Sequence, residues 1–449
     1  MPLSGPAARH PAARRPGVAR VALAPALVTA FAACSNDPAS PRPSVVSTYD
    51  STTAVVGPAA RASYGDTLLA WEQSVFYWQD RVDWARQGAD VRPRVAAATT
   101  HGALWRAANA SINPWLLTAP PGGQDLHSAF FPPSQAPGLV DSPADTARRY
   151  AVVGDTLRRD LAPGPGRVAY LWFPNYAGKT EQGRVDSTQA VIRAVDQSAP
   201  CGWVLDQRFN YGGNIAAMLS GLSPLVGEAA ASTTQNGLGG FLFADRSRGL
   251  LYLQNGQLGT FDPSTNKRYP YGVRPTTNYT LRRPGAPVAI LTGPATASAG
   301  ELITLGFRGG AVPARSFGED TYGVTTGPLG IYLLPDSGYL NITASVMFDR
   351  TGRQYGGVLT PDEPVAGPSW RTLTPGKVLR DGDAVLAAAV RWLQAQPSCT
   401  GAPVASRAVD PERRAAAVRL PGEAKPAPLL DRMSKYFVPR GGAGALAGR

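Results

Sequence analysis

The stretch from Pro287 to Phe307 constrains the fold of this chain more than any other part of the sequence. It begins with the apolar run Val288 to Leu291, which is long enough for a buried strand and too short for a helix. Small residues and a proline follow, and after Ser298 the apolar residues recur at helical spacing. The pattern predicts a buried strand, a tight turn and a helix that begins at Ser298.

Two roles are open for Ser298 at this position. A serine at a helix N-terminus faces backbone N–H groups that stabilise negative charge, so it can attack a carbonyl carbon while the next amide, that of Ala299, helps to hold the oxyanion. Ser298-x-x-Glu301 also has the pattern of a capping box, in which the serine only pairs an orphan N–H group. This stretch alone does not decide between a nucleophile and a cap.

Composition and charge indicate a globular protein without a nucleic-acid partner. The chain has 449 residues, of which 43% are apolar, and it is long enough for more than one folding unit. The net charge is +12, but residues 1–34 contribute +4 of it and residues 400–449 contribute +5. The basic charge therefore belongs mostly to the two ends. The sequence has no glycine-rich phosphate loop, metal-ligand cluster or CxxC motif, so we expect neither a metal nor a cofactor.

The N-terminal residues are typical of an export signal. Four arginines precede the apolar segment Val21–Ala33, which is too short to span a membrane as a mature helix. Phe31-Ala-Ala-Cys34 resembles a bacterial lipobox, in which the cysteine becomes the lipidated first residue. We expect a protein exported to the periplasm or outer cell envelope, with a lipid at Cys34 as its membrane contact. Plain secretion and an unstructured start with an incidental cysteine are the alternatives.

Export gives the two other cysteines a role. Once Cys34 is lipidated, Cys201 and Cys399 remain, and an oxidising compartment would allow them to form a disulfide. Two buried free thiols are the alternative.

Changes in periodicity along the chain predict five segments. Strands alternate with helices in the longest of them, which predicts a layered α/β core with a β-hairpin insertion over residues 228–284. The segments are a signal peptide (1–34), a flexible tether (35–60), an N-terminal helical cap (61–135), the core (136–399) and a disordered tail (400–449). The expected core strands are 168–173, 202–206, 288–291, 330–334 and 339–348, and the expected core helices are 142–160, 187–195, 215–225 and 384–393.

Six segments, in this order along the chain, resemble the S41 peptidases, the family of the C-terminal (tail-specific) processing proteases and the tricorn core protease. They are Asp125-Leu-His-Ser128, Val168–Leu171, Asp206–Gly213, Thr296–Glu301, Phe317–Gly323, and Asp349–Arg353 with Thr360–Asp362. The resemblance covers roughly residues 64–395. It implies a ClpP/crotonase-like α/β core with an N-terminal helical cap, Ser298 as nucleophile, and the amides of Ala299 and of Gly212 or Gly213 as the oxyanion hole.

The chain departs from the tail-specific branch in two ways. Val324 stands where those enzymes have a catalytic lysine, so a serine–lysine dyad is not available. The stretch between His127 and Val168, about 40 residues, is also too short for a PDZ domain, which needs roughly twice that length.

Without the lysine, a histidine is the natural general base. His10 leaves with the signal peptide and His101 lies near the start of a predicted helix, whereas His127 occupies the matching family segment. We therefore expect His127 to be the base. The alternative is a loop histidine that packs the cap against the core.

The sequence does not single out the residue that orients the imidazole. The resemblance to the tricorn branch implies an acid near residues 349–356, where the only one is Asp349. Asp125 and Ser128 flank the histidine and are rivals for the role.

These expectations combine into an exported serine endopeptidase that hydrolyses peptides or unfolded proteins in the cell envelope. The alternative is a non-catalytic envelope binding protein on the same fold, because the lysine is missing. The first predicts that the Ser298 hydroxyl and a His127 nitrogen meet, and the second predicts that they lie apart.

Overall fold

The computed structural model describes residues 55–121, 124–132, 167–176, 181–331, 338–367 and 383–401. The expected signal peptide, most of the tether, the helix predicted over 142–160 and nearly all of the tail lie outside these residues.

The centre of the core is a five-stranded parallel sheet with the order β14-β11-β10-β3-β2. Three of its strands, β2, β3 and β10, are buried along their whole length and consist of nearly continuous apolar residues, as expected for strands covered on both faces. The strands are β2 (Val168–Trp172), β3 (Gly202–Asp206), β10 (Val288–Thr292), β11 (Ala314–Gly318) and β14 (Glu363–Pro364). The predicted strands 168–173, 202–206 and 288–291 are confirmed.

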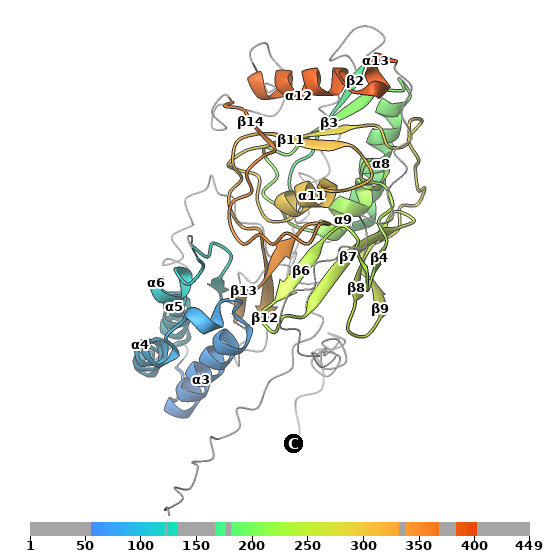
Figure 1. Cartoon of the computed structure of the whole chain (residues 1–449). Coiled ribbons are helices and arrows are strands. Elements are labelled where there is room, and N and C mark those ends of the chain that lie inside the picture. Colours follow the sequence, from blue (N-terminus) through green and yellow to red (C-terminus); the bar gives the residue numbers. More distant parts are fainter. Residues whose placement is uncertain are drawn as a thin grey trace, which may run out of the picture.

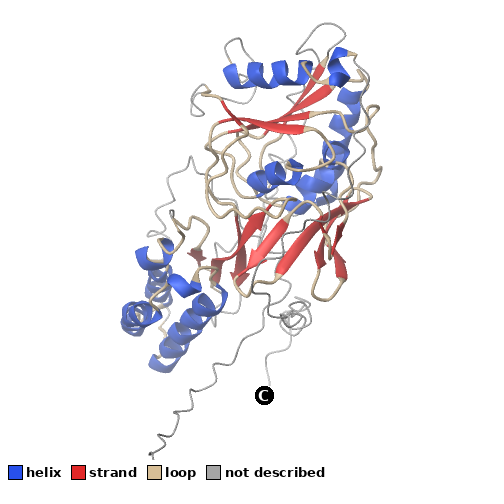
Figure 2. Ribbon diagram, in the orientation of Figure 1, coloured by secondary structure: helices blue, strands red, loops and turns tan. Residues whose placement is uncertain are grey.

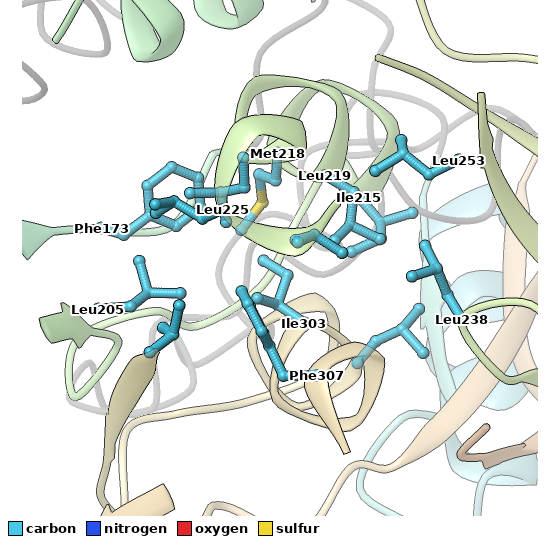
Figure 3. Close-up of a cluster of buried hydrophobic side chains, with 14 of the residues drawn as sticks. Phe173, Leu205, Ile215, Met218, Leu219, Leu225, Leu238, Leu253, Ile303 and Phe307 are labelled. Carbon is cyan, nitrogen blue, oxygen red and sulfur yellow. The ribbon is translucent and has the colours of Figure 1, made fainter. Parts of the chain in front are cut away.

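Helices cover both faces of this sheet (Figure 1). Alternate residues of β10 point to opposite sides: Val288 and Ile290 belong to the core with α8, α9 and α11, whereas Ala289 and Leu291 pack with α12. The helices are α8 (Glu181–Asp196), α9 (Ile215–Gly221), α10 (Ser223–Val226), α11 (Ala299–Phe307), α12 (Ala384–Gln394) and α13 (Pro397–Thr400). In Figure 3, Met218 and Leu219 of α9 lie near Ile303 and Phe307 of α11 in this core.

A second, antiparallel sheet lies on the other side of α8, α9 and α11 (Figure 2). Its order is β1-β13-β6-β7-β8-β9, and β12 also pairs with β13. The strands are β1 (Ala129–Phe131), β6 (Gly240–Phe243), β7 (Arg248–Gln254), β8 (Gln257–Asp262), β9 (Lys267–Pro270), β12 (Thr326–Ile331) and β13 (Tyr339–Phe348), and β4 (Ala231–Ser232) and β5 (Gln235–Asn236) form a separate pair. The predicted insertion thus supplies most of a layer of the core.

The N-terminal helices pack on the outer face of the antiparallel sheet. They are α3 (Pro58–Val75), η2 (Gln79–Arg81), α4 (Trp84–Ala97), α5 (His101–Ser111) and α6 (Pro114–Leu117). Leu68 of α3, Val91 of α4 and Leu104 of α5 share one apolar cluster with Leu340 and Ile342 of β13. The molecule is therefore layered in the order α12, parallel sheet, α8–α9–α11, antiparallel sheet, helical cap, and the expected α/β fold with an N-terminal cap is confirmed.

Three predicted elements have different bounds. The helix predicted over 215–225 is two short helices, because Pro224 in the first turn of α10 cannot donate the hydrogen bond that a continuous helix needs. The helix predicted from residue 187 begins at Glu181. The strand predicted over 330–334 begins at Thr326, where threonine and glycine gave no apolar signal.

Cys201 and Cys399 form a disulfide, which joins the residue before β3 to α13, so of the two alternatives left open by the sequence the structure has the paired one. Among the described residues, no helix is both long and apolar enough to cross a bilayer.

Candidate active site

Ser298 lies where β10 turns into α11, in a conformation that non-glycine residues rarely adopt. Its φ is +52° and its ψ is −114°, and Ala299 begins the helix directly after it. A backbone held in such a region costs about 1–3 kcal/mol and persists only when its surroundings impose it. The side chain is buried. The turn thus holds the hydroxyl-bearing residue in a strained geometry at a helix N-terminus.

The glycine turn after β3 packs directly against Ser298. A Cβ atom at Gly212 would lie 2.8 Å from the Ser298 Cβ and 2.9 Å from the Ala299 N, and one at Gly300 would lie 2.5 Å from the Asn210 carbonyl oxygen. Gly212 and Gly213 have φ of +98° and +117°. Only glycine fits the close approach at Gly212 and its backbone conformation. Three of the residues expected at the site, Ser298, Ala299 and Gly212, are therefore adjacent.

The amides of the expected oxyanion hole differ in their hydrogen bonding. The Gly212 N–H donates to the Asn210 Oδ1 at 3.0 Å. Within the described residues, no acceptor is found for the N–H groups of Gly213 and Ala299. The geometry thus leaves Gly213 and Ala299 as the available donors, whereas Gly212 provides the close contact.

His127 lies on the loop that leads into β1, and its ring contacts the first residue of β12. Its Nδ1 is 2.5 Å from the Thr326 Oγ1, and its carbonyl oxygen accepts from the Asn341 Nδ2 at 2.7 Å. Burial lowers the pKa of His127 to about 4, so the imidazole is neutral at neutral pH and one ring nitrogen can accept a proton.

Asp125 fixes the loop that carries the histidine. Its carboxylate accepts from the His127 N–H at 3.0 Å, from the Thr343 hydroxyl at 2.8 Å and from the Ser128 hydroxyl. Burial raises the pKa of Asp125, and these hydrogen bonds lower it. Asp125 and Ser128 therefore act on the backbone and on β13, whereas the Nδ1 of the imidazole contacts Thr326.

Asp349 is engaged in its own turn. Its carboxylate accepts from the Thr351 N–H and hydroxyl at 2.8 and 2.6 Å, and from the Tyr355 hydroxyl at 2.8 Å. This is an Asx-type turn, a local use of aspartate that the sequence Asp349-Arg-Thr-Gly-Arg353 also permits. The structure does not place this carboxylate against His127.

Glu301 has a larger part in the site than a cap. Its Oε2 accepts from the N–H groups of Ser298 (2.8 Å) and Val324 (3.1 Å), and its Oε1 accepts from the Gly323 N–H (3.0 Å) and the Thr321 hydroxyl. The segment 321–326 therefore runs from Glu301, beside Ser298, to the Thr326 that contacts His127. Nothing in the sequence pattern points to the contacts of Thr321 and Thr326. Only the spacing of Ser298 and Glu301 indicates that the Glu301 side chain reaches the Ser298 backbone.

A layered α/β core that presents a strained serine at a helix N-terminus against a glycine turn defines a protein of the ClpP/crotonase-like class. Residues 167–365 match the model of Peptidase family S41, and this part of the chain is similar to that family.

Two relatives show how far this likeness extends. A nisin-resistance protein from Lactococcus lactis subsp. lactis is 29% identical over 193 residues, which are 42% of this chain, so the chain spans about half (54%) of that relative's length. A lipoprotein structure from Streptococcus agalactiae has 17% identity and a TM-score of 0.51, with 76% of this chain and 98% of that chain covered. At 17% identity, the similarity to this lipoprotein is a similarity of fold alone.

Proposed function

We propose that this chain is an exported serine endopeptidase that cleaves peptides or unfolded proteins in the cell envelope, with Ser298 as nucleophile and His127 as general base. The proposal is carried by the contact of Ser298, Ala299 and the glycine turn: a strained serine has two unpaired amides of the described chain, those of Ala299 and Gly213, close to it. Such amides stabilise an oxyanion because they need no reorganisation when the charge develops.

In the proposed reaction, His127 takes the proton from the Ser298 hydroxyl while the Ser298 oxygen attacks the carbonyl carbon of the substrate. The amides of Ala299 and Gly213 hold the oxyanion, and the protonated imidazole then gives its proton to the leaving amine as the C–N bond breaks. Water releases the acyl group in the reverse sense, with His127 again as base. In this proposal Thr326 takes the orienting role expected of Asp349, because its hydroxyl contacts Nδ1, and Nε2 is the nitrogen assigned to the serine proton.

Export and substrate complete the proposal. The signal-like segment before Cys34 supports a lipid anchor in the envelope, and fatty-acid labelling that Cys34→Ser abolishes would test it. Because one relative is named for nisin resistance, nisin is the first substrate to try, followed by unfolded protein.

The test is a comparison of the native chain with Ser298→Ala. We expect a fluorophosphonate probe to label the native protein at Ser298 and peptide hydrolysis to be lost in the variant, with its thermal unfolding unchanged. Since removal of a nucleophile leaves at most about one part in 10⁴–10⁶ of the rate, the two chains should be easily separated.

The binding protein on the same fold remains the second candidate, because a histidine with a pKa of about 4 is a weak base. It predicts that the native chain binds peptide with neither probe labelling nor hydrolysis. That outcome would end the peptidase proposal.

A further inference from the structure

Glu301 is a buried carboxylate that the proposed reaction does not use. Its side chain has no exposed surface, and among the described residues no arginine, lysine or histidine forms an ion pair with it. Its four hydrogen-bond donors are three backbone N–H groups and one hydroxyl, from Ser298, Thr321, Gly323 and Val324. The negative charge is therefore balanced by neutral dipoles, one at the N-terminus of α11 and three in residues 321–324.

The protonation state of this carboxyl group follows from its partners. An ionised carboxylate has only acceptors and fits four donors, whereas a protonated carboxyl group would turn an O–H donor toward another donor. Protonation must therefore break one of the hydrogen bonds from the backbone N–H groups or reverse the one from the Thr321 hydroxyl. The groups that would lose their acceptor are the strained backbone of Ser298 and the segment that leads to Thr326.

We propose that ionised Glu301 is the positioning residue of the catalytic pair, because one carboxylate fixes both the backbone of the nucleophile and the segment that carries the partner of the His127 imidazole. The proposal rests on the proposed function. Glu301 touches neither substrate nor reacting atoms in this role, and acts through Ser298 and through residues 321–326.

A pH dependence follows. Burial raises the pKa of Glu301 to about 7, although its hydrogen bonds lower it, and no neighbouring charge contributes. None of the groups that contact it titrates. Two charged groups lie nearby but do not pair with Glu301. Asp320, just before Thr321, is exposed to solvent, and Arg208 in the facing turn forms ion pairs with Asp206 and Asp383. As the pH falls through about 7, Glu301 takes up a proton and the pair loses its positioning, whereas His127 stays neutral until about pH 4.

The experiment measures the rate of fluorophosphonate labelling from pH 5 to 9 for the full mature chain. We expect the native rate to rise with pH through a midpoint near 7. In Glu301→Gln this midpoint should disappear and the rate at pH 8 should fall at least tenfold. In Thr321→Val the midpoint should move to higher pH, because the anion loses one hydrogen bond that favours it.

Glu72→Gln is the matched control. Glu72 is also fully buried, and burial raises its pKa to about 7, but it lies in the cap with Ser111 and Gln87 as partners. This variant should keep the native profile. A Glu301→Gln chain that labels with the native midpoint and rate would overturn the proposal. Should that variant fail to fold, as its unfolding temperature would reveal, an unshifted midpoint in Thr321→Val would overturn it equally.

The experiment distinguishes a failure of the proposed peptidase function from a failure of the proposed positioning role of Glu301. A native chain without any labelling at Ser298 contradicts the proposed function, whereas normal labelling with a profile indifferent to Glu301 contradicts only the positioning role.

Discussion

The turn at residues 206–213 and the turn at residues 293–301 pack against each other at Ser298, yet they are stabilised by different chemistry. In the first, Arg208 lies between two buried carboxylates, with its Nη2 2.7 Å from the Asp206 Oδ2 and 2.9 Å from the Asp383 Oδ2. Tyr170 also donates to Asp206 at 2.7 Å. In the second, Glu301 is surrounded by neutral donors only.

The difference lies in what acid can do to each turn. Burial alone would lower the pKa of Arg208, but Asp206 and Asp383 raise it above its usual value, so this side chain stays charged at every pH of interest. Glu301 titrates near neutrality. The turn that carries the Gly213 amide is thus held by an arginine that stays charged. The turn that carries the proposed nucleophile and the Ala299 amide is held by a carboxylate that acid protonates.

The two turns also share one contact point, and a substitution there should have the largest effect on activity. In Gly212→Ala, the added methyl group would meet the Ser298 Cβ and the Ala299 N at under 3 Å, on a backbone with positive φ. We expect labelling and hydrolysis to fall at least about a hundredfold, as when an oxyanion-hole donor is lost. Gly285→Ala is the control, because this glycine also has positive φ but open space around it. Equal losses in both variants would show that backbone strain alone is responsible.

Neutralising one charge of the arginine clamp should have an intermediate effect. Asp383→Asn keeps a side chain that can cap α12, as Asp383 does through the Leu386 N–H, but removes a carboxylate from Arg208. We expect a loss of about 1.5–3 kcal/mol in the free energy of unfolding, typical of hydrogen bonds to charged groups, and a severalfold lower labelling rate.

The midpoint of the pH profile sharpens this prediction. The midpoint should stay near 7 in Asp383→Asn, since the arginine clamp does not contact Glu301. The control for the loss of stability is Asp66→Asn, which removes the exposed Arg92–Asp66 pair and should change the free energy of unfolding by less than about 0.5 kcal/mol. A midpoint that moves with Asp383 would mean that the two turns respond to acid as one unit.

The two turns also differ in how far the sequence predicts them. Apolar runs predict β3 and β10, and the glycines and Ser298 predict the turns that follow, because these are local signals. The partners that hold the turns lie far along the chain: Asp383 is 175 residues from Arg208, and Gly323 is 22 residues from Glu301. No periodicity reports such contacts.

The same reason explains why the sequence does not identify the residue that contacts the His127 imidazole. The resemblance points to Asp349, the one acid in its segment, but this aspartate accepts its hydrogen bonds from Thr351, Arg353 and Tyr355 close by in the chain. The contact of His127 with Thr326 arises because the loop before β1 and the start of β12 meet across β13, which is a property of the sheet and not of either segment. Thr326 in the sequence looks like any β-branched residue before a strand.

The disulfide should have the smallest effect on activity, although it stabilises the fold. Replacing both cysteines, in Cys201→Ser/Cys399→Ser, should lower the free energy of unfolding by about 2–5 kcal/mol. The labelling rate and its midpoint should change less than twofold, because Cys399 follows the C-terminal end of α12 whereas Asp383 caps its N-terminal end, and Val385 and Leu386 keep that end packed on the parallel sheet. Urea unfolding and probe labelling in parallel provide the measurement, and reductant should reproduce the loss in the native chain while leaving the variant unaffected. If the labelling rate of the double variant falls as far as that of Asp383→Asn, the ion pairs of Arg208 depend on the disulfide. The turn at residues 206–213 would then be sensitive to reduction, as the turn at residues 293–301 is to acid.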